Sequence, residues 1–289
     1  MTHFADRLLS ACDKVGSPVC VGIDPVLERL PEGLAADGSA VERIEAFGLE
    51  IIEAVADRVP AVKPQSACFE RYGAAGVAAY DRIVASARSA GLIVIGDAKR
   101  GDIGTSAAHY AAGCLVGAEG APGPDALTIN SYFGHDGIQP FVDAAAPLGR
   151  GLFALVRTSN PGGDAIQDRQ LADGGTVAEA VAELIAQLGA GTVGEQGYSL
   201  LGAVVGATKP EDAARLRKLM PRQIFLVPGY GAQGGGAEDV LPCFHDDGRG
   251  AIVTSSRSVI YAQPEGGSSW QQAVADAADG LAEAVASVL

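Results

Sequence analysis

The chain has 289 residues, 48% of them hydrophobic, and a formal net charge of −14. Its length suits one complete barrel of alternating strands and helices, although two smaller domains would also fit. The acidic charge disfavours nucleic acid as a partner, and no apolar stretch approaches the roughly 20 residues of a membrane helix. We therefore expect a soluble protein without a nucleic-acid or membrane partner, in which a few local cations and amides still suffice to bind a small phosphate.

Eight short apolar runs recur along the chain. Their nearly continuous hydrophobicity is typical of strands covered on both faces, as in a parallel sheet. We predict strands at residues 19–24, 59–64, 92–97, 126–130, 152–156, 200–205, 224–227 and 251–254. Because helical segments lie between them, the α/β class is indicated, with residues 1–289 forming one TIM (β/α)8 barrel domain. A doubly wound open sheet shares the same local pattern and stays open as the alternative.

Three predicted helices begin with the same signal, a hydroxyl residue three positions before a glutamate, which indicates a capping box. The pairs are Ser39 with Glu42, Thr176 with Glu179, and Thr208 with Glu211. The third is followed by Pro210 in the expected first turn. Residues 176–189 carry one apolar stripe at helical spacing, and Trp270 is expected to anchor the last helix to the barrel.

Polar residues stand at or near the ends of the first four predicted strands. They are Asp24, Lys63, Asp97 and Asn130. Residues at the carboxyl ends of barrel strands are where TIM barrels place their chemistry. This position favours the closed barrel over the open sheet.

The charged run DAKRGD at residues 97–102 is the main candidate for chemistry. Asp97 and Lys99 are two apart on an extended strand end and so project to the same side, with Lys63 beside them from the preceding strand. Flanking carboxylates hold a lysine as ammonium and repel a further negative charge. Such an array suits a carbanion that is stabilised and protonated by Lys99. The alternative is a solvated charge cluster at a helix start, where Asp102 complements the helix dipole.

A second group of residues indicates phosphate binding. The glycine-rich segment 228–236 follows the seventh predicted strand, and Arg257 follows the eighth. Glycines let backbone amides approach an oxyanion, arginine pairs with it bidentately, and these two loops commonly bind phosphate in barrels. The alternative is that the glycine-rich segment is only a flexible turn and that Arg257 caps a helix or pairs with a surface acid.

The polar turn 157–163 is a third motif. Its hydroxyl and backbone amides can form hydrogen bonds with the edge of a planar amide group in a ligand.

Taken in order, these motifs resemble the orotidine 5'-phosphate decarboxylase family, in its longer bacterial branch (the type 2 subfamily). The markers are GIDP at 22–25, VKP at 62–64, DAKRGDIGTS at 97–106, TSNPG at 158–162, PGYGAQG at 228–234 and SRS at 256–258. They span nearly the whole chain. The resemblance implies decarboxylation of orotidine 5'-phosphate to UMP and CO2, the last step of de novo UMP synthesis, with no metal or cofactor.

The resemblance also implies roles for the charged residues. Asp24 and Lys63 would hold the ribose hydroxyls, and Lys63 would also orient Asp97 toward the scissile carboxylate. Lys99 would protonate C6 of the pyrimidine. Asp102 would reach into the neighbouring subunit's site, which implies a homodimer. The residues that would accompany it there are Ile103 and Ser106.

For the rest of the substrate, the resemblance implies that Ser159 reads the pyrimidine amide and that Gln233 bridges the pyrimidine and the phosphate from a closing loop. Arg257 and Tyr230, with nearby amides, would grip the phosphate. Pro228 and Ser256 complete the expected substrate-binding set. Three features depart from the shorter branch of the family, namely Tyr230, Ser256 and the long segment 164–175.

Two other functions stay open. A sugar-phosphate decarboxylase or hexulose-phosphate synthase of the same barrel type carries the same Asp-x-Lys-x-x-Asp pattern but uses Mg²⁺. It places a carboxylate near the second strand end, where this chain has Lys63. A nucleotide-binding barrel that acts as a sensor or scaffold would keep the phosphate grip but would need no charged array.

The remaining residues indicate no metal site. The five cysteines stand singly, without a Cys-x-x-Cys pair, and are expected to be reduced, mostly core residues. The four histidines share no spacing and are expected to pack or to face solvent. The first residues lack a cationic segment followed by an apolar one, so we expect a cytoplasmic protein.

Overall fold

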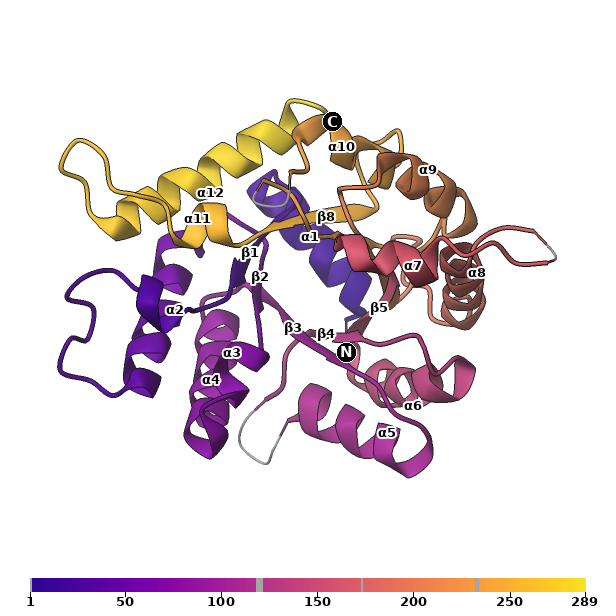
Figure 1. Ribbon diagram of the computed structural model, residues 1–289, viewed down its shortest axis with the longest axis horizontal. Helices are drawn as coiled ribbons and strands as arrows, with labels where there is room; N and C mark the ends of the chain where they lie inside the picture. Colours follow the sequence, from indigo (N-terminus) through magenta and orange to yellow (C-terminus); the bar gives the residue numbers. More distant parts are fainter. Residues whose placement is uncertain (1, 118–121, 173, 232–233) are drawn as a thin grey trace.

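The computed structural model describes residues 2–117, 122–172, 174–231 and 234–289 (Figure 1). Eight parallel strands form a closed barrel in sequential order. The strands are β1 (Val19–Ile23), β2 (Ala61–Pro64), β3 (Ile93–Arg100), β4 (Ala126–Ile129), β5 (Gly151–Arg157), β6 (Leu201–Val205), β7 (Phe225–Val227) and β8 (Ala251–Ser255). Because β8 pairs with β1, the predicted TIM barrel is confirmed and the open sheet is excluded.

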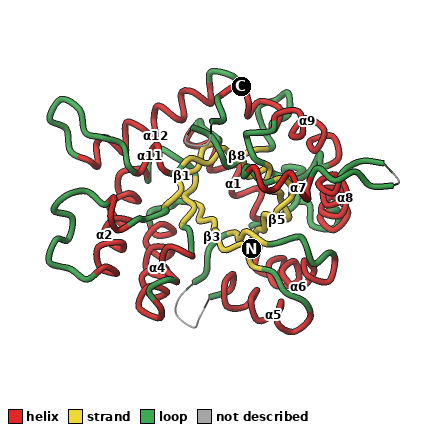
Figure 2. Tube along the Cα trace, in the orientation of Figure 1, coloured by secondary structure: helices red, strands yellow, loops and turns green. Residues whose placement is uncertain are grey.

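Helices surround this barrel (Figure 2). The α-helices are α1 (Phe4–Val15), α2 (Ala40–Val55), α3 (Ala67–Glu70), α4 (Gly73–Ser89), α5 (Gly104–Ala111), α6 (His135–Ala145), α7 (Asp164–Gln167), α8 (Val177–Gly189), α9 (Pro210–Leu219), α10 (Ala237–Val240), α11 (Arg257–Ile260) and α12 (Trp270–Ala286). The shorter elements are the 3-10 turns η1 (Leu27–Arg29), η3 (Ala146–Leu148), η4 (Pro161–Gly163) and η5 (Leu241–Cys243), and the π-helical turn η2 (Ala112–Val116). None of the helices described here is long and apolar enough to cross a membrane.

Side chains of the strands alternate between two cores. Along β3, Ile93 and Ile95 belong to the core inside the barrel, whereas Val94 belongs to the core between barrel and helices. The α1 helix contributes to the inner core through Phe4, whose ring meets Phe153 edge-on with centroids 5.8 Å apart. The barrel interior is therefore filled with side chains, as expected for eight strands.

Two of the three capping boxes are confirmed, at Ser39 and at Thr176. The third prediction was wrong. The α9 helix begins at Pro210, so its N-cap is Lys209 and the Thr208–Glu211 spacing is out of register by one residue. The Thr208 hydroxyl instead donates to the carbonyl of Ser159, at 3.3 Å.

The last helix is anchored as predicted. Trp270 stacks on Phe47 of α2 with ring centroids 5.0 Å apart, and its indole N–H donates to the carbonyl of Ile260 at 3.1 Å. This packing ties α12 to α2 and α11 and so supports the strand ends of β8 and β1.

The five cysteines are free; Cys20 and Cys243 are buried and the other three are partly buried.

Candidate active site

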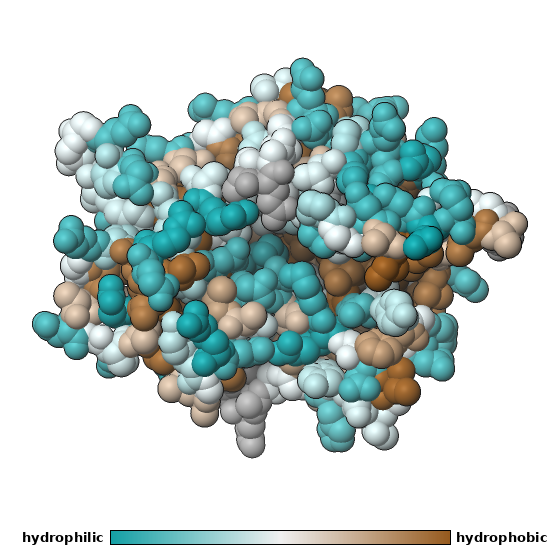
Figure 3. Space-filling view, in the orientation of Figure 1, coloured by the Kyte–Doolittle hydropathy of each residue, from teal (hydrophilic) through white to brown (hydrophobic). Residues whose placement is uncertain are grey.

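A cavity of about 540 Å³ opens at the carboxyl ends of the strands, a size typical of small-molecule sites. All eight strands or the residues directly after them contribute to its lining. Figure 3 shows a hollow in this face of the molecule with hydrophilic residues around it. The loops that carry the lining residues thus converge at the end of the barrel where TIM barrels bind their ligands.

Asp97 is the centre of a charged array in this cavity. Its Oδ2 lies 2.7 Å from Nζ of Lys63, and its Oδ1 lies 2.5 Å from Nζ of Lys99. The amide of Gln65 donates to Oδ2 at 3.1 Å, and the hydroxyl of Thr128 donates to Oδ1 at 2.9 Å. The structure therefore brings together the three charged residues that the sequence placed at neighbouring strand ends.

Burial and pairing act in opposite directions on the array. Burial raises the pKa of Asp97, but the ammonium groups of Lys63 and Lys99 lower it more, and the result is well below the ordinary value. Burial lowers the pKa of Lys63, but the carboxylates of Asp97 and Asp24 raise it above its ordinary value. The aspartate is therefore ionised and Lys63 protonated at neutral pH.

The route by which Asp97 and Lys99 meet differs from the prediction. We expected an extended strand end, but β3 continues to Arg100, and Lys99 has a φ of +47°, in the left-handed region. The pairing of β3 with β4 shifts register between Gly96 and Arg100. The two side chains are therefore brought together by a local turn of the backbone and not by the pleat of a regular strand.

Thr128 and Gln65 were missed by the sequence analysis. The Thr128 hydroxyl accepts hydrogen bonds from the backbone amides of Ala98 and Lys99, both at 3.0 Å, in addition to its bond to Asp97. For Thr128 the available signal was a polar residue between the apolar Leu127 and Ile129. Gln65 had a similar signal, as the polar residue that directly follows β2.

Asp24 follows β1 and lines the same cavity. Its Oδ1 is buried and has no hydrogen-bond partner among the described residues. A buried carboxylate oxygen without a partner is rare in folded proteins and is readily explained by a ligand donor. The hydroxyl of a sugar is such a donor.

The residues expected at the phosphate line the cavity from β7 and β8. They are Pro228, Tyr230, Ser256 and Arg257, and Gln233 lies outside the described residues. Arg257 is exposed at the first position of α11, and no described carboxylate lies within ion-pair distance of it. The hydroxyls of Ser255 and Ser258 lie 2.6 Å apart beneath this turn. An anion in the cavity therefore finds a guanidinium that no described acid neutralises.

Ser159 lines the cavity next to Thr158, at the end of β5. The three residues expected to serve a neighbouring subunit lie elsewhere. Asp102, Ile103 and Ser106 do not line their own cavity, and the Asp102 carboxylate accepts a hydrogen bond from the following amide at 2.8 Å. Ile103 is 57% exposed. The structure thus separates these residues from the array of their own chain.

A further residue was underestimated from the sequence. Arg157 was read only as the start of a polar turn, but it is the last residue of β5 and is completely buried. Its guanidinium lies 2.8 Å from a carboxylate oxygen of Asp212 and 2.8 Å from one of Asp164. Sequence spacing gave no signal for the contact with Asp212, because Asp212 comes from α9, which follows β6.

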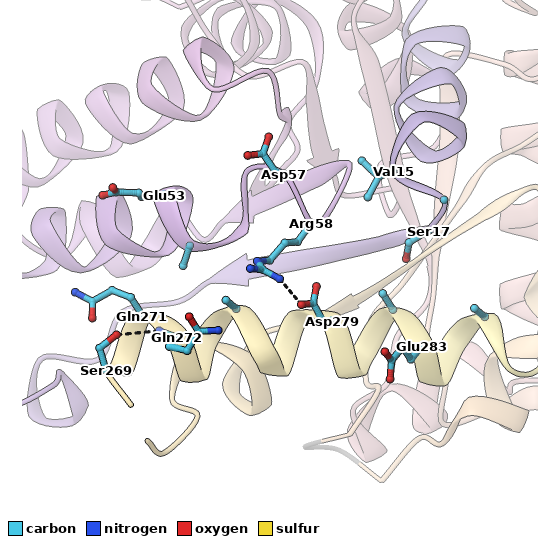
Figure 4. A pocket seen from close by; sticks show the side chains of 15 residues that line it. Val15, Ser17, Glu53, Asp57, Arg58, Ser269, Gln271, Gln272, Asp279 and Glu283 are labelled. Carbon is cyan, nitrogen blue, oxygen red and sulfur yellow. Dashed lines mark hydrogen bonds and ion pairs between the residues drawn. The ribbon is translucent and has the colours of Figure 1, made fainter. Parts of the chain in front are cut away.

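A wider hollow of about 820 Å³ lies on the outside of the barrel, between α2, α12 and the end of α1 (Figure 4). Arg58 forms an ion pair with Asp279 across it. The other charged residues in its lining are Glu53, Asp57 and Glu283. Because carboxylates predominate there, this hollow disfavours an anionic ligand, and the cavity at the strand ends is the better candidate site.

Comparison with known proteins agrees with this architecture. The sequence profile of the orotidine 5'-phosphate decarboxylase / HUMPS family matches residues 17–271. The protein named orotidine 5'-phosphate decarboxylase in Rhodopirellula baltica is 45% identical, over 95% of this chain and 96% of that one, and the one in Streptomyces coelicolor is 42% identical, over 92% of each. The solved structure of Leishmania donovani OMP decarboxylase is 30% identical with a TM-score of 0.78, over 99% of this chain and 98% of that one. The chain therefore belongs to the orotidine 5'-phosphate decarboxylase / HUMPS family.

Proposed function

We propose that this protein decarboxylates orotidine 5'-phosphate to UMP and CO2, the last step of de novo UMP synthesis, without a metal or cofactor. The observation that carries the proposal is the ionised Asp97 between Lys63 and Lys99, in a cavity that Arg257 also lines. The names of the relatives support the same substrate.

The array accounts for both halves of the reaction. The carboxylate of Asp97 repels a substrate carboxylate that is held against it. This repulsion between the two carboxylates ends when CO2 leaves and the carbanion forms. When the bond from C6 to the carboxylate breaks, CO2 leaves and the electron pair stays on C6. The ammonium of Lys99, whose side chain is 47% exposed, stabilises this carbanion and then transfers a proton to C6. Lys99 regains its proton from solvent.

The remaining lining residues bind the parts of the substrate that do not react. The orphaned carboxylate oxygen of Asp24 and the ammonium of Lys63 hold the ribose hydroxyls, and Ser159 reads the pyrimidine amide. Arg257 and Tyr230 hold the phosphate. Pro228, Ser256 and Gln233 complete this side of the site. Binding energy from the phosphate then helps to hold the carboxylate against Asp97.

We also propose that the chain acts as a single cytoplasmic domain that forms a homodimer. Asp102, with Ile103 and Ser106, would enter the partner's site. Exposed apolar side chains lie directly before α5, on α5 and in the loop between β4 and α6. Such exposed apolar groups mark protein interfaces. They are Ile103, Tyr110, Tyr132 and Phe133.

A magnesium-dependent sugar-phosphate enzyme is the main rival within the same family. In that rival a carboxylate near the end of the second strand holds the metal. Here Lys63 is the second-last residue of that strand and donates to Asp97, so a cation already stands where the metal ligand is required. The other rival is a nucleotide sensor. A protein that only binds a nucleotide does not require two lysines paired with one buried carboxylate.

One assay separates the three functions. Loss of orotidine 5'-phosphate absorbance is followed with native protein in the presence of EDTA, beside a parallel reaction with a keto-sugar phosphate and Mg²⁺. Turnover of orotidine 5'-phosphate with EDTA present is expected. No turnover of it refutes the proposal, and sugar-phosphate activity that EDTA abolishes supports the magnesium enzyme instead.

A further inference from the structure

The connection after β5 contains a charged cluster around a fully buried arginine. Arg157 is 0% exposed, and its guanidinium lies within 2.9 Å of carboxylate oxygens of Asp164, Asp168 and Asp212. The first two carboxylates belong to the segment 164–168 and the third to α9. A buried guanidinium is favourable only with near-complete pairing, so this cluster fixes the segment against the end of β5.

Gln167 connects the cluster to the cavity. Its Oε1 accepts from Nη1 of Arg157 at 3.0 Å and from the backbone amide of Thr158 at 2.9 Å. Its Nε2 donates to the hydroxyl of Thr158, also at 2.9 Å. Gly163 packs so closely that a Cβ there would lie 2.7 Å from the same hydroxyl. One glutamine side chain therefore satisfies both polar groups of Thr158, which lines the cavity.

Ser159 is held from its other side. The Thr208 hydroxyl donates to its carbonyl at 3.3 Å, and a Cβ on Gly206 would come within 2.9 Å of its backbone nitrogen. Lys209 follows directly and pairs with Asp164 at 2.8 Å. The backbone of residues 158–159 is thus clamped between the segment 161–168 and the start of α9.

These contacts point to one region of the ligand. The charged array comes from β2 and β3, and the phosphate residues follow β7 and β8, whereas Thr158 and Ser159 follow β5. Among the described residues, no hydrogen bond or ion pair joins the side chains of Arg157, Gln167 or Thr208 to the charged array or to Arg257. We therefore expect the clamp to act on the part of the ligand that Thr158 and Ser159 contact.

We propose that Arg157, Gln167 and the segment 161–168 form a latch that positions Thr158 and Ser159 for recognition of the pyrimidine base. This inference rests on the proposed function, in which Ser159 reads the pyrimidine. Arg157 and Gln167 act through Thr158 and Ser159 and are positioning residues. The latch explains why two of the three carboxylates that pair with Arg157, those of Asp164 and Asp168, lie in the segment that follows β5.

The test compares a ligand that has the base with one that lacks it. Dissociation constants of UMP and of ribose 5-phosphate are measured by titration calorimetry for native protein and for Gln167→Leu, which leaves Arg157 and its three carboxylates in place. Two lost hydrogen bonds to Thr158 are expected to weaken UMP binding by about tenfold or more. Ribose 5-phosphate binding is expected to stay within about twofold of native, because its contacts are unchanged.

Arg169→Ala is the matched control, because Arg169 lies in the same region and is exposed, and among described groups its side chain donates only to the carbonyl of Ala165. Both dissociation constants should stay native in this variant. Arg157→Lys keeps the positive charge but loses the planar arrangement of guanidinium N–H donors, so it should repeat the selective loss of UMP affinity. If this variant does not fold, the Gln167→Leu result alone decides.

Equal weakening of both ligands, or no change in either, in Gln167→Leu overturns the latch. Native protein that decarboxylates orotidine 5'-phosphate while Gln167→Leu binds UMP normally overturns the latch alone. Native protein that binds ribose 5-phosphate but neither binds UMP nor turns over orotidine 5'-phosphate overturns the proposed function and the latch with it.

Discussion

The hydroxyl of Thr128 donates to Oδ1 of Asp97 at 2.9 Å, the same oxygen that the ammonium of Lys99 approaches at 2.5 Å. That hydroxyl also accepts from the amides of Ala98 and Lys99. One side chain on β4 therefore orients the carboxylate and supports the left-handed backbone of the lysine. A residue in that conformation costs of order 1–3 kcal/mol unless its surroundings hold it, as Thr128 does here.

Replacement of Thr128 by valine tests this arrangement. Thr128→Val keeps the branched shape but leaves the amides of Ala98 and Lys99 without their acceptor and removes one of the two donors to Oδ1 of Asp97, so kcat should fall by about 10- to 100-fold. The Michaelis constant should change little, since the hydroxyl does not hold the phosphate. Steady-state kinetics check this. Thr128→Ser should restore most of kcat, and a valine variant with native kcat would contradict the arrangement.

Arg257 is expected to act only through the phosphate. Arg257→Ala removes a charge-assisted hydrogen bond, so kcat/KM for orotidine 5'-phosphate should fall by about 10- to 100-fold. With orotidine, which lacks the phosphate, the variant should match the native protein. Initial rates with both substrates provide the measurement. An equal loss with orotidine would show that Arg257 supports the fold or the reacting centre instead.

The depressed pKa of Asp97 has a consequence for stability. Burial raises this pKa, but Lys63 and Lys99 lower it more, so the folded-state value lies below the unfolded value of about 4. Such a carboxyl contributes stability above its unfolded pKa and loses it as the pH falls toward the folded pKa. The difference in unfolding free energy between native protein and Asp97→Asn should therefore shrink between pH 7 and pH 3. Urea denaturation at both pH values measures it, and a difference that stays constant or grows would argue against paired ionisation.

Subunit complementation tests the proposed role of Asp102. Lys99→Ala and Asp102→Ala chains are each expected to be nearly inactive, but a dimer of one chain of each kind contains one site with native Lys99 and native Asp102. After random mixing, about one quarter of all sites should be complete, with activity in proportion. Mixtures that stay inactive, although hybrid dimers are demonstrated, would place Asp102 in its own subunit's site.

The sequence predicted the barrel well because its signal is repeated. Eight apolar runs that alternate with helical segments allow few parallel arrangements, and polar residues at four strand ends fix which end is functional. The approach of Lys63 to Asp97 followed from that topology alone. The backbone conformation at the end of β3 was less predictable, because the positive φ of Lys99 depends on the Thr128 hydroxyl, which lies on another strand.

Long-range charge pairing and exact helix starts were not predictable. Arg157 is buried among three acids, Asp164 and Asp168 in the following connection and Asp212 on α9, and a single arginine in a polar turn carries no sign of that. The Thr208–Glu211 spacing matched a capping box, yet Pro210 set the helix start one residue later. Tertiary contacts decided the first case. In the second, the hydroxyl of Thr208 donates to the carbonyl of Ser159 and does not cap the helix.

The most direct test of the charged array is the rate of orotidine 5'-phosphate decarboxylation by Lys99→Ala in the presence of EDTA. Lys218→Ala, which changes an exposed lysine on α9, is the control and should match native protein. Without the ammonium that stabilises and protonates the carbanion, the rate should fall by about 100- to 10,000-fold. Full turnover by Lys99→Ala would contradict the assignment of the proton donor and, with it, the account of the array.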